Sequence, residues 1–149
     1  MHDYYLLLWY QFASIYFMSN DLDNALKWVN AIVNRRFKVD RKDLENYARI
    51  LNLMIHFELG NTFLLKYMVE NSRRWMKKQQ TLKPLERALL KFFGKLSHAP
   101  KGDYSIHFQQ LHNTLFDEVN PLVNANILDY LDFRQWIGQY LKRNPILHS

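Results

Sequence analysis

The chain has 149 residues, of which 48% are hydrophobic, and carries a formal net charge of +6. This length suits one domain with a real core, and the apolar content excludes a disordered chain. There is no cysteine, which excludes disulfides and cysteine-ligated metals and favours a reducing compartment such as the cytoplasm. The positive charge permits an acidic partner without requiring one.

The first predicted helix, about residues 3–18, is apolar nearly all round. Its stretch YYLLLWYQFASIYFM has 15 residues, fewer than the ~20 that a helix needs to cross a bilayer, and it lacks the features of a signal peptide. We therefore expect no membrane segment. Because an apolar helix must be covered on more than one side, we expect that this chain is the C-terminal part of a longer protein, or that it self-associates through this helix.

Capping residues and helix breakers divide the rest of the chain. The turn Ser19-Asn20-Asp21 is expected to supply the N-cap of the second helix, and Asp40 is expected to cap the third. Gly60 is expected to end the third, and Asp103 to cap the sixth after a break at 98–102. No stretch alternates with period two for long, so no sheet is expected. The predicted helices cover about residues 22–35, 41–58, 62–79, 82–97, 104–118 and 121–142, the last one bent or broken near Asn126.

Seven residues near the N-terminus stand at regular intervals: Trp9, Phe12, Ala13, Tyr16, Ala25, Val29 and Ile32. Their spacing matches the tetratricopeptide-repeat signature, which begins with Trp and continues with Tyr and Ala at fixed intervals. Ile32 is larger than the pattern expects, and Phe37 stands where the family usually has proline. The segment resembles this family, which implies a helix–turn–helix unit over about residues 3–36.

A weaker copy follows over about residues 40–79, at an offset of 39 residues. Its segment YARILNLMIHFELGN, with the basic helix and the LLKFFGKL run that follow, resembles the C-terminal part of bacterial tetratricopeptide-repeat proteins of unassigned function. The resemblance implies an all-α fold, a right-handed α-α superhelix of about seven antiparallel helices. It would form one domain over residues 1–149, with the C-terminal helices at about 82–142.

Residues suited to catalysis or metal binding are few. Asp103 and His107 share a helix face, but a zinc site needs at least three protein ligands. His56 lies in an apolar helix and is interpreted as a satisfied, half-buried histidine. The chain contains no motif for a nucleophile, a metalloprotease or a phosphate-binding loop. We therefore expect no enzyme activity, no cofactor and no metal.

Positive charge gathers between residues 66 and 101, where ten Lys or Arg minus two acids leave a net +8. Helical spacing predicts basic stripes on two helices, and Trp75 lies among the charges. These stripes are interpreted as a solvated exterior, as a groove for an acidic peptide, or as a nucleic-acid surface where cations neutralise phosphates and aromatic rings stack on bases. Their members are Arg73, Arg74, Lys77, Lys78, Arg87, Lys91 and Lys95.

The function predicted from the sequence is a non-catalytic protein–protein interaction scaffold. It would dock a protein or peptide on a concave surface built from the first helix of each pair. The alternative is a nucleic-acid-binding helical repeat that uses the basic face of residues 66–101. Candidate partner contacts on the first helices are Tyr5, Gln11, Tyr47, Arg49 and Asn52.

Overall fold

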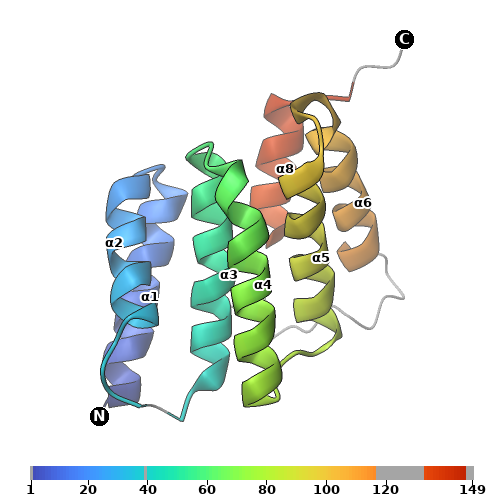
Figure 1. Ribbon diagram of the computed structural model, residues 1–149. Helices are drawn as coiled ribbons and strands as arrows, with labels where there is room; N and C mark the ends of the chain where they lie inside the picture. The colour runs from blue at the N-terminus through green and yellow to red at the C-terminus, as the bar shows by residue number, and fades with distance from the viewer. Residues whose placement is uncertain (1, 39, 117–132, 147–149) are drawn as a thin grey trace. The chain divides into compact units, whose positions relative to one another are not determined.

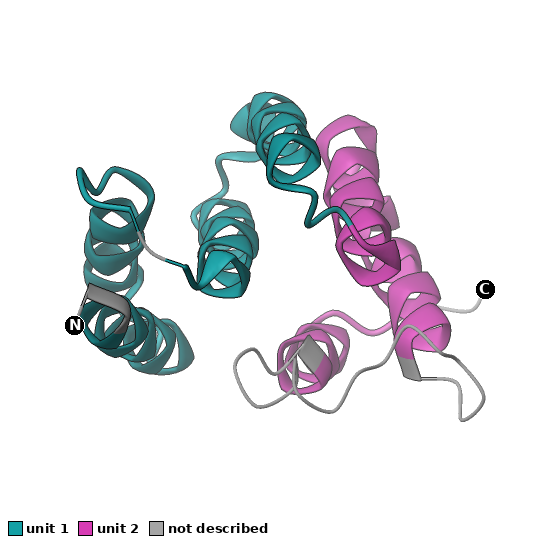
Figure 2. Ribbon diagram, turned by 90° about the horizontal axis from the view of Figure 1, so that it is seen from below, with its two compact units in different colours: residues 1–82 teal, residues 83–149 magenta. Residues whose placement is uncertain are grey.

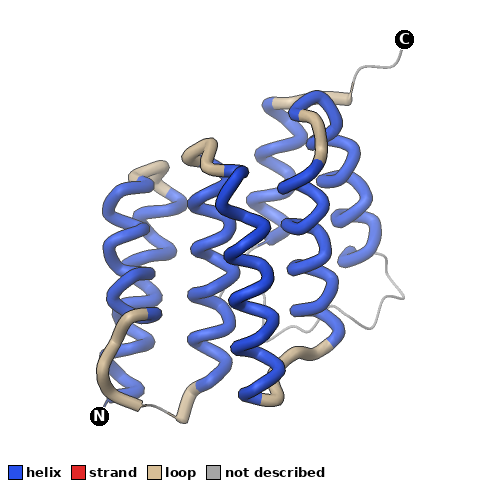
Figure 3. The backbone as a smooth tube through the Cα atoms, in the orientation of Figure 1, coloured by secondary structure: helices blue, strands red, loops and turns tan. Residues whose placement is uncertain are grey.

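The computed structural model describes residues 2–38, 40–116 and 133–146. Within these ranges the chain forms seven α-helices and one short 3-10 helix, with no strand (Figure 3). The all-α prediction is therefore confirmed for the described residues. The part of the last predicted helix that falls within 117–132 lies outside them.

The backbone groups into two compact units, residues 1–82 and residues 83–149 (Figure 2). Each unit holds a core of its own. The single domain over residues 1–149 and the superhelical stacking of all helices stay predictions.

The first unit consists of two helical hairpins (Figure 1). Helix α2 packs on α1 and on α3, while α3 also packs on α4 and contacts α1. Because α3 has neighbours on several sides, most of its side chains from Leu44 to Phe57 are buried. The helices are α1 (His2–Met18), α2 (Leu22–Val33), α3 (Lys42–Glu58) and α4 (Thr62–Gln79).

Helices α1 and α2 pack on each other and carry the residues that match the repeat signature. Among these residues Ala13, Ala25, Val29 and Ile32 are buried. Aromatic rings continue the packing from α1 to α2 and to the segment that follows α2. The ring centroids lie 4.9 Å apart for Phe12 and Trp28, 6.5 Å for Trp9 and Trp28, and 5.7 Å for Trp9 and Phe37.

Local sequence explains the ends of these helices. The Asp21 carboxylate accepts a hydrogen bond from the backbone N–H of Asn24 at 3.3 Å, so the predicted cap within the turn 19–21 is confirmed and Asp21 provides it. Gly60 follows Leu59, the C-cap of α3, and has φ +81°, as predicted. Its N–H donates to the Phe57 carbonyl and that of Asn61 to the His56 carbonyl. These two bonds form a Schellman motif, in which the left-handed residue suits glycine.

Two predicted caps are wrong. The residue before α3 is Arg41, not Asp40, and its side chain makes no capping bond. Instead, Arg41 holds Asp43 through two hydrogen bonds of 3.0 and 2.8 Å. Asp103 is the last residue of a 3-10 helix that runs directly into α6, so it lies inside a continuous helical stretch.

The second unit contains α5 (Pro84–His98), the 3-10 helix η1 (Lys101–Asp103), α6 (Tyr104–Phe116) and α8 (Phe133–Arg143). Helix α6 packs on both α5 and α8. Its buried Phe108 lies at the centre of an aromatic core, with ring centroids 5.0 Å from Phe92, 5.0 Å from Trp136 and 3.9 Å from Tyr140. This core holds the three α-helices together.

Candidate interaction surfaces

Helix α1 presents an exposed apolar face. Tyr4 is 67% exposed and Ile15 is 61% exposed, and Tyr5 and Met18 are exposed as well. Positions 4, 11, 15 and 18 follow the helical period, so Tyr4, Gln11, Ile15 and Met18 share one side of the helix. We call Tyr4, Gln11, Ile15 and Met18 the α1 face.

The buried side of α1 lies opposite this face. Leu6, Tyr10, Ala13 and Phe17 repeat every three or four residues and enter the core. Hydrophobic residues on both sides explain why the sequence of this helix is apolar nearly all round. Of the predicted contact residues on α1, Gln11 is exposed on the α1 face, whereas Tyr5 is exposed on a neighbouring side of the helix.

The predicted contact residues on α3 do not form an exposed surface. Tyr47 is only 8% exposed, because its ring packs 6.1 Å from that of Tyr10; its prediction as a partner contact is corrected here. Asn52 is half-buried, and its Oδ1 is shielded from solvent with no hydrogen-bond partner among the described residues. Arg49 is half-buried too and belongs to a network inside the first unit.

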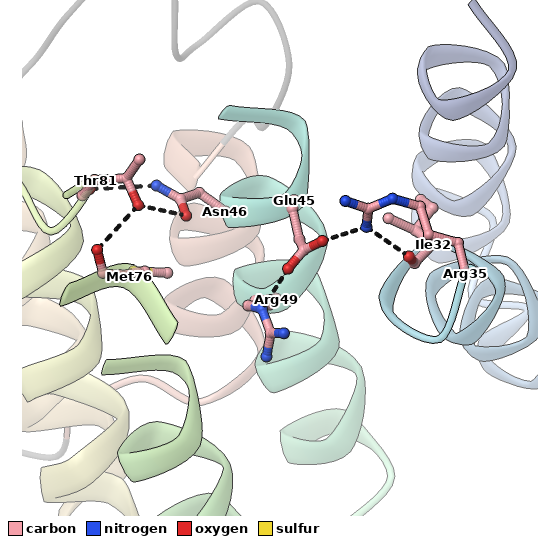
Figure 4. A network of polar contacts seen from close by, with 7 residues as sticks. All are labelled: Ile32, Arg35, Glu45, Asn46, Arg49, Met76 and Thr81. Atoms are coloured by element: carbon pink, nitrogen blue, oxygen red, sulfur yellow. Dashed lines mark hydrogen bonds and ion pairs between the residues drawn. The ribbon is translucent and has the colours of Figure 1, made fainter. Parts of the chain in front are cut away.

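That network centres on Glu45, a buried carboxylate that the sequence analysis missed (Figure 4). Its Oε1 accepts a hydrogen bond from Arg35, and its Oε2 accepts one from Arg49 at 3.1 Å. The Arg35 guanidinium also donates to the Ile32 carbonyl at 2.9 Å, and Arg49 lies 4.7 Å over the ring of Trp75. The network therefore connects α2, α3 and α4, and its two arginines are structural groups.

A neutral pair ties α3 to the end of α4 (Figure 4). The Asn46 amide donates to the Thr81 carbonyl at 3.3 Å, while the Thr81 hydroxyl lies 3.2 Å from Asn46 Oδ1. These bonds satisfy a buried amide, and an amide without partners there would be costly. The only sequence signal for them is the polar residue Asn46 within an apolar helix.

The basic residues of α4 are largely exposed. Arg74, Lys77 and Lys78 face solvent, whereas Arg73 is half-buried. Trp75 is half-buried under Arg49, so its ring already has a cationic partner. Two aromatic residues not predicted as contacts, Phe63 at 70% and Tyr67 at 63% exposure, share the outer side of this helix with the cations.

The remaining basic stripe lies on α5 in the second unit. Arg87, Lys91 and Lys95 are all exposed, at the spacing of one helical turn that the sequence predicted. The stripes on α4 and α5 belong to different compact units.

The histidines do not belong to a metal-binding cluster within the described ranges. No group of three or more His, Asp or Glu residues that would hold a metal ion occurs in that part of the chain. His56 is half-buried, its Nδ1 lies 3.2 Å from the Asn61 amide, and burial lowers its pKa. This placement agrees with the interpretation of His56 as a satisfied structural residue.

Glu86 in α5 is a buried carboxylate whose Oε2 has no hydrogen-bond partner among the described residues. The pKa of Glu86 is raised because burial disfavours the charged carboxylate. Backbone hydrogen bonds and the charge of Lys83 act in the opposite direction but offset only part of this effect. A raised folded pKa means that the folded state keeps the proton longer than the unfolded chain. The charged form therefore destabilises the fold as the pH rises from the unfolded pKa through the folded one.

Replacing Glu86 by Gln is expected to raise the free energy of unfolding by on the order of 1 kcal/mol at about pH 7. The gain should shrink toward about pH 4, where the glutamate is itself protonated. Urea unfolding at several pH values measures it. Glu70→Gln, at an exposed site on α4, serves as the control and should change little. A gain that does not vary with pH would contradict the assignment to carboxylate burial.

Comparison with known proteins finds no matching family model and no similar curated protein or solved structure. Helices long and apolar enough to cross a membrane do not occur in the described residues.

Proposed function

We propose that this chain is a non-catalytic protein-interaction module, built from helical hairpins that resemble tetratricopeptide repeats, and that its α1 face docks an apolar segment of a partner protein. The observation that carries the proposal is the exposure of Tyr4, Ile15 and Met18 on one side of a helix that is buried on the other. Exposed apolar patches on soluble domains usually mark interaction sites.

The packing within the first unit supports this proposal. In stacked hairpins, the first helix of each pair contacts the first helix of the next, and α1 and α3 make such a contact. The α1 face also combines a tyrosine ring, that of Tyr4, with one polar group, Gln11. Interfaces favour that mixture, because tyrosine supplies a large rigid surface with a polar tip. The absence of cysteine supports a cytoplasmic location for the module.

The test compares two single-charge variants of the immobilised chain. Ile15→Glu places a carboxylate in the centre of the α1 face, whereas Asn30→Glu adds the same charge at an exposed polar position of α2. We expect a discrete protein from native lysate to bind wild type and Asn30→Glu. Its affinity for Ile15→Glu should fall at least about tenfold, which is typical of a central interface residue.

Circular dichroism of both variants checks that the helices remain. Equal capture by Ile15→Glu and Asn30→Glu would remove the α1 face as the docking site. A dimer in wild type that dissociates in Ile15→Glu, seen by light scattering, would assign the face to a second copy of the chain.

The outer side of α4 favours a second candidate function, nucleic-acid binding. Phe63 and Tyr67 are exposed on the same side of the helix as Arg74, Lys77 and Lys78, and aromatic rings interleaved with cations suit single-stranded nucleic acid. Capture from lysate on the immobilised chain also tests this second function. Nucleic acid held through its phosphates would be released at low salt, because such binding weakens steeply as salt is added. It would also be lost in Arg74→Glu and retained in Ile15→Glu.

A further inference from the structure

A cleft of about 210 Å³ lies between α5 and α6 in the second unit. Its floor is apolar, since Phe92 and Leu111 line it and both are buried. One rim carries Lys91 and Lys95 of α5, and the other carries Gln110 and Thr114 of α6. The cleft therefore offers an apolar contact between a cationic rim and a neutral polar rim.

The charge of this cleft is unbalanced. Lys91 and Lys95 are one helical turn apart, on one side of α5, and both are exposed. Neither forms an ion pair within the described part of the chain, and no Asp or Glu lines the cleft. A concave site lined by one sign of charge attracts ligands of the opposite sign.

Polar groups of α6 add capacity for hydrogen bonds. His107 lines the cleft, and its Nδ1 is shielded from solvent with no partner among the described residues. The Thr114 hydroxyl donates to the backbone carbonyl of Gln110 at 2.9 Å. The hydroxyl oxygen of Thr114 can still accept a hydrogen bond, and the side-chain amide of Gln110 can donate one. A carboxylate held by the lysines would find a further donor across the cleft.

We propose that the α5–α6 cleft binds an acidic segment of a partner protein, with glutamate or aspartate carboxylates at Lys91 and Lys95 and a neighbouring apolar side chain on the floor formed by Phe92 and Leu111. The site goes beyond the α1 face, because it lies in the other compact unit. Its volume is below the roughly 300–1,000 Å³ of small-molecule pockets, which suits side chains better than a whole cofactor.

Nucleic acid fits this cleft less well than an acidic peptide. The aromatic residue of its lining, Phe92, is buried beneath the surface and packs on Phe108. Stacking on bases requires a ring that is accessible on its face. The apolar floor also has no counterpart in a phosphate backbone, whereas a leucine next to a glutamate would contact it.

The test measures binding of the full chain to a fluorescent peptide of sequence Glu-Leu-Glu-Glu-Leu-Leu by anisotropy. Two altered probes separate the contributions: one has Gln for each Glu, and the other has Ser for each Leu. We expect each altered probe to bind at least about tenfold more weakly. Amide NMR shifts on addition of the first peptide should be largest at Lys91, Lys95, Gln110 and Thr114.

Variants of the lysines provide the second arm. The double variant Lys91→Glu with Lys95→Glu is expected to lose about tenfold or more in affinity for the peptide. The control, Lys101→Glu with Lys142→Glu, makes the same charge change at exposed sites outside the cleft lining. It should lose less than about twofold in affinity. Lys91→Met with Lys95→Met removes the charge but keeps the aliphatic stems, and it should show the intermediate loss.

Three results would overturn the proposal. These are no measurable binding of the peptide by wild type, equal losses in the two double charge-reversal variants, and tighter binding of a labelled oligothymidine than of the peptide. The α1 variant Ile15→Glu should bind the peptide as wild type does, so failure of the cleft and failure of the α1 face are distinguishable.

Discussion

Replacing Glu45 by Ala is expected to lower the free energy of unfolding of the first unit by about 3–5 kcal/mol. Glu45 is buried and accepts hydrogen bonds from both Arg35 and Arg49. Its removal leaves two guanidinium groups that are largely screened from water, with side-chain exposures of 12% and 17%, and no carboxylate to balance them. Urea unfolding followed by circular dichroism measures the loss.

The exposed pair of Arg41 and Asp43 provides the matched control. Asp43 also accepts two bonds from an arginine, but both side chains of this pair are more than a third exposed. Water screens such a pair, so Asp43→Ala should cost less than about 1 kcal/mol. If Glu45→Ala costs no more than Asp43→Ala, the network does not hold α2, α3 and α4 together.

Replacing Phe108 by Ala is expected to lower the free energy of unfolding of the second unit by about 3–5 kcal/mol. The side chain is fully buried and contacts rings from α5 and α8. Deleting it removes apolar burial and leaves a cavity at the centre of the unit. Native-state hydrogen exchange measures the effect locally, and the amides of α5, α6 and α8 should lose protection together.

Ile106→Ala on the same helix is the control for this substitution. Ile106 is largely exposed, so its truncation should change the free energy of unfolding by less than about 1 kcal/mol. The amides of α1 to α4 provide an internal reference in the Phe108→Ala protein. An equal loss of protection in all helices would mean that the two compact units unfold as one.

The sequence predicted the helices well where local chemistry decides their ends. Asp21 caps α2 and Gly60 ends α3, because a short polar side chain or a missing Cβ acts on the backbone next to it. The prediction failed at Asp40. Adjacent residues compete there, and the bond from Arg41 to Asp43 depends on side chains that no capping rule considers.

Contact residues were harder to predict than helices. The sequence placed Tyr5 and Tyr47 together as partner contacts, yet Tyr5 is exposed and Tyr47 is buried against Tyr10. Both are tyrosines in apolar helices, and the period of each helix leaves several sides apolar. The neighbouring helix decides which side is covered. For the same reason, Trp75 is a partner of Arg49 and not a free ring among cations.

By itself the sequence determined the all-helical character of the described chain, most helix boundaries and the basic stripe on α5, because these depend on interactions between residues a few positions apart. Only the tertiary structure decided that Glu45 is buried between two arginines, that α1 keeps an apolar face exposed, and that Lys91 and Lys95 border a cleft with α6. Burial and charge balance arise between segments distant in the sequence, and the packing of one helix on another selects which apolar side is covered.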